Sequence, residues 1–564
     1  MLSTLSLGLF LTAAAAQEPR TPQQLDLGTL AYDPAVVSEG NLTTILWKDG
    51  VSSELYASSS DGRGVDWSTP VRVDDAPAGT ARYISNHSLA IADGVVYAAW
   101  RDERNGADDA YFARSLDGGQ SWSSALRLED GYSAGAQSVD ALQIVASGDF
   151  VYVAMRVDNP GGGEDIWMAS SMDQGVNWNP SLMANTGGAD CDYFSVSCEG
   201  INVFVTFADD RNQAGMDDLF LRMSHNGGVT WMMNMLDEQI DEAGPGVGDV
   251  EAPEVLSAGG MTGLVVAWLE DETPTSAVSE ELHVRYSPDG GHMWPIPESV
   301  IGSGFDVENP ALAFDGVTIL VAWEDDRTGS DEVYLAVSRD FGISWTEHQI
   351  SYGGGAYPVL SGEGDLWAVA YSAGGFPERT EMAVSRDGAM SFLPATDLER
   401  GAGADSDYVE LAYNAMYGNF VVTWLDDAAG SNGVFAGGAR PQTLQAVSPS
   451  FAPGDSIHFE ASHFPVSDDG ANFAVFVSRG TGNYAVPYGD GRSTGLATNP
   501  YLPNYLNVLS GTLDSAGFGA TVPTTVPPTP GVTWYATAMS YLVSGSTGRV
   551  YPLTLTDRIE IPVQ

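Results

Sequence analysis

Apolar and polar residues follow one pattern that returns about every fifty residues along this chain. In the clearest copy, a short apolar strand at Pro310–Phe314 precedes Ile319–Trp323, which is apolar throughout and therefore expected to be buried on both faces. A polar loop comes next, followed by a third strand at Glu332–Val337 and a fourth at Thr346–Ser351. Four short antiparallel strands in one such unit are typical of a β-propeller blade.

The apolar second strand of the unit can be counted along the chain. It occurs eight times, at Thr43–Trp47, Val96–Trp100, Val151–Met155, Val203–Phe207, Leu264–Trp268, Ile319–Trp323, Leu366–Ala370 and Phe420–Trp424. The sequence therefore predicts an all-β protein with an eight-bladed β-propeller, or seven blades if one weak repeat is irregular.

The eighth unit has no fourth strand of its own, because its third strand at Val434–Gly438 runs directly towards Pro441. The segment Gln23–Gly28 precedes the first strand of the first unit and resembles the fourth-strand segment His348–Ser351. We expect the N-terminal segment to supply the outer strand of the eighth blade. Pairing of this kind removes an open sheet edge that would otherwise invite aggregation.

A turn with a recurring sequence follows the third strand. Ser338–Trp345 reads Ser-x-Asp-x-Gly-x-Ser-Trp. An Asp side chain can accept hydrogen bonds from nearby backbone N–H groups, Gly permits positive φ, and Trp packs a large face into the layer below. Related copies lie at Ser59–Trp67 with one extra residue, Ser115–Trp122, Ser171–Trp178, Ser224–Trp231, Ser287–Trp294 and, with Ala for Gly and Phe for Trp, Ser385–Phe392.

This turn resembles the Asp box, or bacterial neuraminidase repeat, of sialidases and related β-propellers, over roughly residues 22–440. The resemblance implies a structural turn on the face opposite the active site. It also implies three Arg for a substrate carboxylate, a Tyr nucleophile paired with Glu, and an Asp acid/base. The family's Tyr/Phe-Arg-Ile-Pro motif has no match, because Ala81–Ser85 has another order and no Pro, and the family's catalytic propeller has six blades. We therefore assign no catalytic residue.

The two ends of the chain differ from the repeats. Residues 1–16 form an apolar run that ends in four Ala, which is typical of a secretory signal peptide cleaved after Ala16. We assign 17–440 to the propeller. Beyond it the turns stop, and strands expected at Ser456–Ala461, Thr533–Ala538 and Arg558–Pro562 predict a β-sandwich accessory domain at 441–564. The protein is expected to be secreted or held at the cell surface, and to be a monomer.

Charge narrows the range of partners. The chain has 23 Lys and Arg against 75 Asp and Glu, a formal net charge of −52. Such a charge argues against nucleic acid or an anionic membrane as partner. It favours adaptation to a salty, halophilic setting, and the alternative is an acidic secreted protein without such adaptation. No segment after the signal peptide is long and apolar enough to predict a transmembrane helix.

Two sets of loops are expected to share the face opposite the turns. The first set follows the second strands. Its charged residues either pair with one another and stiffen the loops or form a polar ligand surface. The set comprises Trp100–Arg104, Arg156–Asp158, Asp209–Arg211, Glu270–Glu272, Asp325–Arg327 and Asp426–Asp427.

The second set leads into the inner strands and carries Asp33, Asp140, Asp192, Glu251, Glu308 and Asp407, with Asn86 and Tyr357 in the two remaining places. Carboxylates so arranged must be paired, protonated or bridged by a cation. Carboxylate oxygens suit calcium, so calcium is the one cofactor considered, with these residues as ligands: Asp140, Asp192, Glu251, Glu308 and Asp407. The alternative is that these side chains cap backbone N–H groups of the inner strands.

The function predicted from these patterns is binding of an extracellular glycan or protein, without sialidase catalysis. Exo-sialidase or divergent polysaccharide-active chemistry is the first alternative, and a cell-surface adhesion or structural role is the second. Residues that fall in the loops leading to the inner strands are the candidates for ligand contact: Arg82, His87, Tyr132, Tyr357 and Arg400.

Overall fold

The computed structural model describes most of the propeller and parts of the C-terminal region. The described residues are 22–26, 28, 30–60, 64, 66–77, 83–129, 131–185, 189–231, 237–258, 263–271, 280–302, 305–375, 377–399, 406–427, 432–439, 443–447, 456–462, 471–478, 510–513, 519–521, 524–525, 533–543, 550–555 and 559–562. The predicted signal peptide lies outside these residues, as do Arg82 and Arg400. Every element in the described part of the chain is a strand, so these residues contain no helix that could span a membrane.

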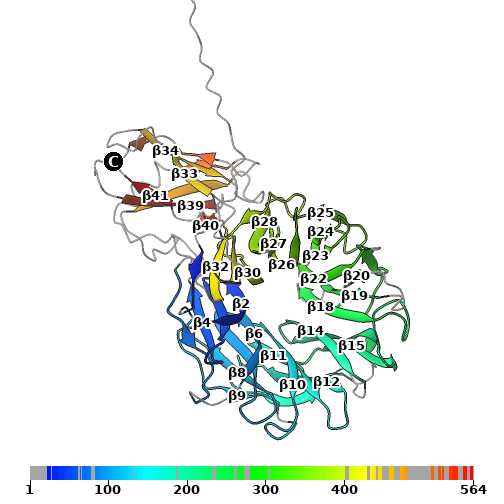
Figure 1. The fold of residues 1–564 in the computed structure, drawn as a ribbon. Helices are drawn as coiled ribbons and strands as arrows, with labels where there is room; N and C mark the ends of the chain where they lie inside the picture. Colours follow the sequence, from blue (N-terminus) through cyan, green and yellow to red (C-terminus); the bar gives the residue numbers. More distant parts are fainter. Residues whose placement is uncertain are drawn as a thin grey trace, which may run out of the picture.

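Eight four-stranded antiparallel sheets are arranged around a central opening (Figure 1). The prediction of an eight-bladed propeller is confirmed. We number the blades 1 to 8 by their innermost strands. These are β2 (Ala31–Glu39), β6 (Ile84–Ala92), β10 (Val139–Ser147), β14 (Cys191–Glu199), β18 (Val250–Ala258), β22 (Val307–Phe314), β26 (Gly355–Glu363) and β30 (Ser406–Asn414).

The second strands are buried along almost their whole length, as their apolar sequences predict. They are β3 (Leu42–Asp49), β7 (Val95–Asp102), β11 (Phe150–Asp158), β15 (Asn202–Gln213), β19 (Gly263–Glu270), β23 (Ile319–Asp325), β27 (Leu366–Ala373) and β31 (Asn419–Asp426).

The third strands precede the recurring turns, and the fourth strands form the outer edge. The third strands are β4 (Leu55–Ser60), β8 (Asp109–Ser115), β12 (Glu164–Ser171), β16 (Met216–Ser224), β20 (Glu281–Ser287), β24 (Glu332–Ser338), β28 (Arg379–Ser385) and β32 (Gly433–Ala439). The fourth strands are β5 (Val71–Arg72), β9 (Leu126–Arg127), β13 (Asn179–Met183), β17 (Glu238–Gln239), β21 (Ser299–Ile301), β25 (Thr346–Gln349), β29 (Thr396–Asp397) and β1 (Gln23–Gln24).

The ring closes through the N-terminal segment, as the sequence predicts. In β1, Gln23 and Gln24 pair antiparallel with β32 of blade 8. The carboxylate of Asp26 then accepts a hydrogen bond from the N–H of Val434 at 3.1 Å. Outer-strand carboxylates cap third strands elsewhere in the same way, since Glu129 accepts from Ala110 N–H and Asp241 from Leu219 N–H. The fourth-strand position of blade 8 is therefore filled from the other end of the propeller sequence.

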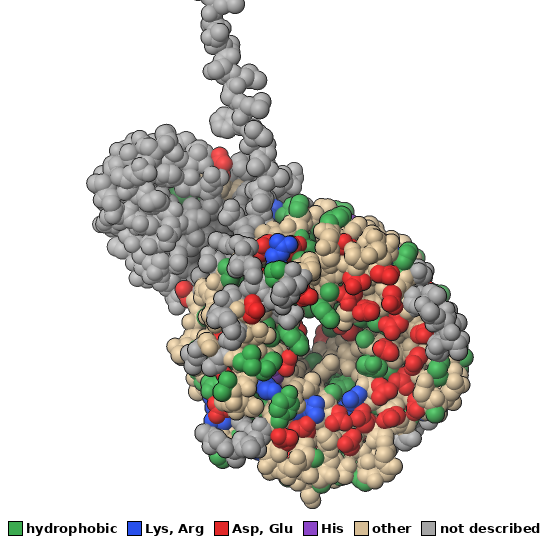
Figure 2. Space-filling model, in the orientation of Figure 1, with side chains coloured by type: hydrophobic (Ala, Val, Ile, Leu, Met, Phe, Trp, Pro, Cys, Tyr) green, Lys and Arg blue, Asp and Glu red, His purple; other side chains and the backbone are tan. Residues whose placement is uncertain are grey.

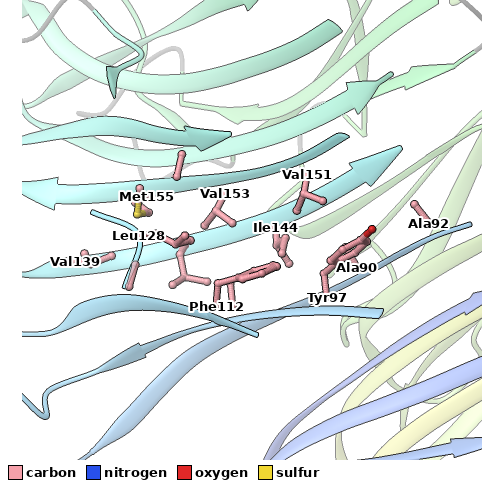
Figure 3. Close-up of a cluster of buried hydrophobic side chains, with 14 of the residues drawn as sticks. Ala90, Ala92, Tyr97, Phe112, Leu128, Val139, Ile144, Val151, Val153 and Met155 are labelled. Atoms are coloured by element: carbon pink, nitrogen blue, oxygen red, sulfur yellow. The ribbon is translucent and has the colours of Figure 1, made fainter. Parts of the chain in front are cut away.

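The hydrophobic cores lie between neighbouring blades. Between blades 2 and 3, Tyr97 and Phe112 from one sheet pack with Ile144 and Val153 from the next (Figure 3). All four side chains are almost fully shielded from water. Because each core needs two sheets, a single blade cannot bury its apolar face alone.

The recurring turns form with the expected hydrogen bonds. In the copy after β24, Asp340 Oδ1 accepts from Ser344 N–H at 2.8 Å, and Ser338 Oγ accepts from Gly342 N–H at 2.8 Å. The most divergent copy makes the same bonds, from Ser391 N–H to Asp387 and from Ala389 N–H to Ser385. The turn therefore depends on its Ser and Asp more than on its Gly and Trp.

Two further sheets are described beyond the propeller. One contains β33 (Thr443–Val447), β34 (Ser456–Ser462), β37 (Gly519–Ala520) and β38 (Thr524–Thr525). The other contains β36 (Ser510–Thr512), β35 (Asn472–Ser478), β39 (Thr533–Val543), β40 (Val550–Leu555) and β41 (Ile559–Pro562). The strands expected near residues 456, 533 and 558 are present, while a sandwich of the two sheets stays a prediction.

Candidate functional site

Each inner strand carries an irregularity at the same level of the ring. The pairing between first and second strands shifts register once in every blade, at the residues where the acidic loops lead into the strands. In six blades the shifted segment begins with a residue at positive φ, between 39° and 54°: Asp33, Asn86, Ala252, Asn309, Tyr357 and Tyr408. A β-bulge turns side chains away from the regular alternation, and here it directs them towards the opening.

A cavity of about 680 Å³ lies among these bulges. Its wall includes His87, Glu254, Tyr357, Tyr408 and Glu410, contributed by four inner strands and the bulges in them. The predicted ligand candidates His87 and Tyr357 therefore do line a hollow. The side chain of His87 contacts the carbonyl oxygen of Asp33 at 2.6 Å, which fixes its ring against blade 1.

Four exposed tyrosines mark the approach to the inner strands. Their exposed fractions are 52% for Tyr83, 39% for Tyr193, 59% for Tyr357 and 58% for Tyr408. Tyr193, Tyr357 and Tyr408 lie in or beside bulges, and Tyr83 directly precedes β6. Exposed aromatic rings can serve as contact points for a ligand.

One of these tyrosines is paired with a carboxylate. Tyr193 Oη donates to Glu251 Oε2 at 3.3 Å, between blades 4 and 5. Burial and then the charge of Glu251 raise the pKa of Tyr193. The phenol therefore stays protonated at neutral pH.

Three cations occupy equivalent positions near the ends of the second strands of blades 1 to 3. Lys48 lies 3.7 Å from the centre of the Tyr83 ring. Arg101 donates to the carbonyl oxygen of Asp140 at 2.5 Å and pairs with Asp108 at 2.5 Å. Arg156 likewise donates to the carbonyl oxygen of Asp192 and pairs with Glu164 at 2.7 Å. Each arginine thus fastens the bulge of the next blade and is already neutralised by a carboxylate.

Carboxylates gather on the right of the opening in Figure 2. Beside Arg156, two further groups of acidic residues bring side-chain oxygens within 4.8 Å of one another. One contains Asp140, Asp158 and Glu164, and the other Glu164, Asp190 and Asp192. Burial, followed by the hydrogen bond to Asp140, raises the pKa of Glu164 to about 8.

The structure places the predicted metal ligands unevenly. Asp140 and Asp192 lie in the two groups that share Glu164. Glu251 is engaged by Tyr193, and Glu308 is exposed at the start of β22. The side chain of Asp407 lies outside the described part of the chain. Calcium binding by these residues stays a prediction.

Tyr132 does not belong to this surface. Its ring packs against Trp167 of blade 3 with centroids 5.5 Å apart, and its carbonyl oxygen accepts from Arg127 at 3.1 Å. Its position before β10 suggested an open loop, whereas the side chain fills the gap between blades 2 and 3.

The Asp-x-Arg loops after the second strands are structural. Arg104, Arg211 and Arg327 each fold back onto the Asp two residues earlier. Each guanidinium also lies 4.0 or 4.1 Å from the centre of an aromatic ring on the third strand of the same blade: Tyr111, Phe220 and Tyr334. Pairing within the blade, rather than ligand contact, accounts for these three loops.

Backbone capping of the inner strands occurs, through Asn86 of the predicted set and through two residues further along the inner strands. Asn86 accepts from Leu142 N–H at 2.6 Å, and Gln143 accepts from Val196 N–H at 3.1 Å. Glu254 accepts from Leu312 N–H at 2.8 Å. These side chains accept hydrogen bonds from backbone N–H groups at the edge of the next blade's inner strand. Without them, those N–H groups would have only water as a partner.

Sequence reasoning missed Tyr193, Tyr408, Glu254 and Glu410. Burial raises the pKa of both glutamates to about 7, although water in the cavity reaches Glu410. The two tyrosines directly follow the predicted acidic residues Asp192 and Asp407, and this adjacency is the signal that was available.

Comparison with known proteins adds the following. No protein-family model matches the sequence, and no curated protein matches it. Among solved structures the chain is similar to an ulvan lyase from a family of polysaccharide lyases, with 13% identity, a TM-score of 0.43 and 65% of this chain and 94% of that chain covered. It is also similar to an α-L-arabinofuranosidase from Fusarium graminearum, with 14% identity, a TM-score of 0.36 and 53% of this chain and 92% of that chain covered. A sialidase from Trypanosoma rangeli is similar with 11% identity, a TM-score of 0.33 and 75% of this chain and 87% of that chain covered.

Proposed function

We propose that the protein is an extracellular binding module that holds a glycan without acidic groups at the mouth of its propeller. The observation that carries this proposal is the set of four exposed tyrosines around the opening, Tyr83, Tyr193, Tyr357 and Tyr408, set among carboxylates. Aromatic faces suit the apolar faces of sugar rings, and carboxylates accept hydrogen bonds from sugar hydroxyl groups.

Electrostatics favours a neutral or amino-bearing glycan over a sialylated or sulfated one. The chain carries a net charge of −52, and Arg101 and Arg156 at the mouth are already paired with carboxylates. A negatively charged sugar would be repelled by the surrounding field and would find no free guanidinium described there.

The test is a binding screen of the purified chain against neutral, amino-bearing and acidic oligosaccharides, followed by calorimetry on the best ligand. Tyr193→Ala and Tyr408→Ala should each weaken binding by about tenfold or more, about 1.4 kcal/mol. Tyr352→Ala is the control, because Tyr352 is 80% exposed beyond the outer strand β25, away from the inner strands. Exclusive binding of acidic glycans would contradict the proposal.

Glycosidic cleavage of sialidase type is a second candidate, favoured by the Tyr193–Glu251 pair at 3.3 Å. The resemblance of the turns to the Asp box implies a Tyr nucleophile that is paired with a Glu. Release of sialic acid from a fluorogenic substrate, abolished by Tyr193→Phe, would favour this function over binding alone. Absence of release at high protein concentration would leave the binding function as the better account.

A further inference from the structure

Two histidines from neighbouring recurring turns face each other at the junction of blades 4 and 5. His225 lies in the turn after β16, and His292 lies in the turn after β20. Their Nε2 atoms are 3.2 Å apart, and their ring centroids are 5.3 Å apart. Both side chains are partly exposed, so a solute can reach the space between the rings.

This pair of imidazoles departs from the pattern of the other turns. At the two preceding junctions the same two positions hold apolar residues, Leu116 with Val176 and Met172 with Val229. All four of these side chains are at least 40% exposed. The two histidines therefore occupy an accessible site on the turns, where the repeat itself requires no polar side chain.

The hydrogen bonds of His225 determine which of its nitrogens is free. Nδ1 of His225 lies 2.9 Å from Oδ1 of Asn202. An amide oxygen only accepts, so Nδ1 carries the proton and donates to Asn202, and Nε2 presents a lone pair towards His292. A hydrogen bond that fixes the outer nitrogen of an imidazole in this way is typical of histidines that bind a metal.

We propose that His225 and His292 together bind one divalent transition-metal ion, of the class of zinc, nickel and copper, which links blade 4 to blade 5. Imidazole nitrogens suit these ions. Two nitrogens that each lie about 2.0–2.1 Å from a tetrahedral zinc ion are about 3.3–3.4 Å apart. The separation of 3.2 Å between the two Nε2 atoms is close to this value.

The ion takes the place of a shared proton. Without metal, Nε2–H of His292 donates to the lone pair on Nε2 of His225. On binding, that proton moves to Nδ1 of His292, which has no hydrogen-bond partner among the described residues, and both rings stay neutral. Metal binding therefore needs a change of tautomer in one ring and no rearrangement of the two turns.

Water completes the coordination of the ion. Within the described part of the chain, no third His, Cys, Asp or Glu has a ligand atom within 4.8 Å of both imidazoles. Two protein ligands leave open positions, unlike the closed four-ligand sites of structural zinc, so the ion should exchange with solution. The turns join third strands to fourth strands, at the end of the blades opposite the mouth, so this site does not depend on the glycan proposal.

The test is calorimetric titration of zinc chloride into the chelator-treated full-length chain, in excess magnesium chloride. Magnesium occupies carboxylate sites and leaves imidazole free. We expect one zinc ion per chain, and His225→Gln and His292→Gln should each weaken its binding about tenfold or more, because loss of an outer hydrogen-bond partner alone costs about that much. His348→Gln is the matched control, because its ring packs against Phe392 of another junction and its removal should leave zinc binding unchanged.

Copper(II) in place of zinc counts the ligands. Its electron paramagnetic resonance spectrum should show coupling to two imidazole nitrogens in the wild type and to fewer in either variant. Zinc should also raise the melting temperature of the wild type and not that of the variants, because the ion binds the folded pair. Unchanged zinc affinity in either variant would overturn the proposal, as would an equal loss in His348→Gln or coordination of copper by oxygen alone.

Discussion

At the scale of single residues, the recurring turn depends on backbone conformations that few residues adopt. Gly175 has φ +74°, and a Cβ placed on it would lie 2.5 Å from Cζ of Phe112 in the neighbouring blade. The equivalent residue in blade 7 is Ala389, which keeps a positive φ of 63°. The positive φ thus tolerates the methyl group of Ala389 in blade 7. At Gly175, a methyl group would collide with Phe112.

Gly175→Ala should therefore destabilise the protein by about 2–4 kcal/mol, the sum of left-handed backbone strain and overpacking against Phe112. Denaturant unfolding followed by tryptophan fluorescence measures the change. Gly161→Ala is the control, because a Cβ there meets nothing within 4 Å, and it should stay within about 0.5 kcal/mol of the wild type. Equal effects of the two substitutions would contradict this account of the turn.

At the scale of the element, the two-residue strand β1 closes the ring of blades despite its short length. Its pairing with β32 completes blade 8, and Asp26 strengthens the junction by accepting from Val434 N–H and, at 2.7 Å, from Gly28 N–H. Without it, the apolar strand β32 would present an unpaired edge, which is a site for aggregation.

Asp26→Ala should lower the free energy of unfolding by about 1–3 kcal/mol, because two backbone donors at the junction lose their acceptor. Thermal unfolding with light scattering would show a lower midpoint and earlier aggregation than in the wild type. Asp66→Ala removes an exposed carboxylate of blade 1 and serves as control. If Asp26→Ala unfolds at the wild-type temperature, β1 does not seal the ring.

At the scale of the whole molecule, acidity and burial act together. Burial raises the pKa of several carboxylates to about 7 or 8, among them Glu129, Glu254, Glu270 and Glu280. These groups belong to four different blades when Asp217 and Glu410 are included. A folded-state pKa above the unfolded value means that the folded chain holds the proton more tightly, so this stability is present at low pH and is lost as pH rises through the folded value.

The melting temperature should accordingly fall as pH increases from 6 to 8 and level off above pH 8, where these carboxyls have lost their protons in the folded chain as well. Differential scanning calorimetry at fixed ionic strength measures it. The double variant Glu254→Gln and Asp217→Asn should show a shallower fall, because two of the titrating groups are gone. A melting temperature that stays constant or rises over this range would contradict the raised pKa values.

The repeat pattern predicted most of the fold because it depends on local sequence. Eight apolar second strands, the turn with its Ser and Asp, and the match between Gln23–Gly28 and His348–Ser351 are each readable in one segment. The candidate site was predicted only in part. Asp140 and Asp192, predicted from their position before inner strands, lie in groups of acidic side chains, and their role as ligands stays a prediction. Tyr132 was expected in an open loop, but it packs against Trp167 of another blade.

By itself, the sequence determined that this chain is an acidic, eight-bladed propeller closed by its N-terminal strand, because strand period, turn chemistry and charge are properties of neighbouring residues. Only the tertiary structure decided which side chains meet at the mouth. The bulges turn Tyr193 and Tyr408 outward, and Arg101 and Arg156 are paired with neighbouring carboxylates. These outcomes depend on contacts between strands and between blades, which the order of residues along one segment does not specify.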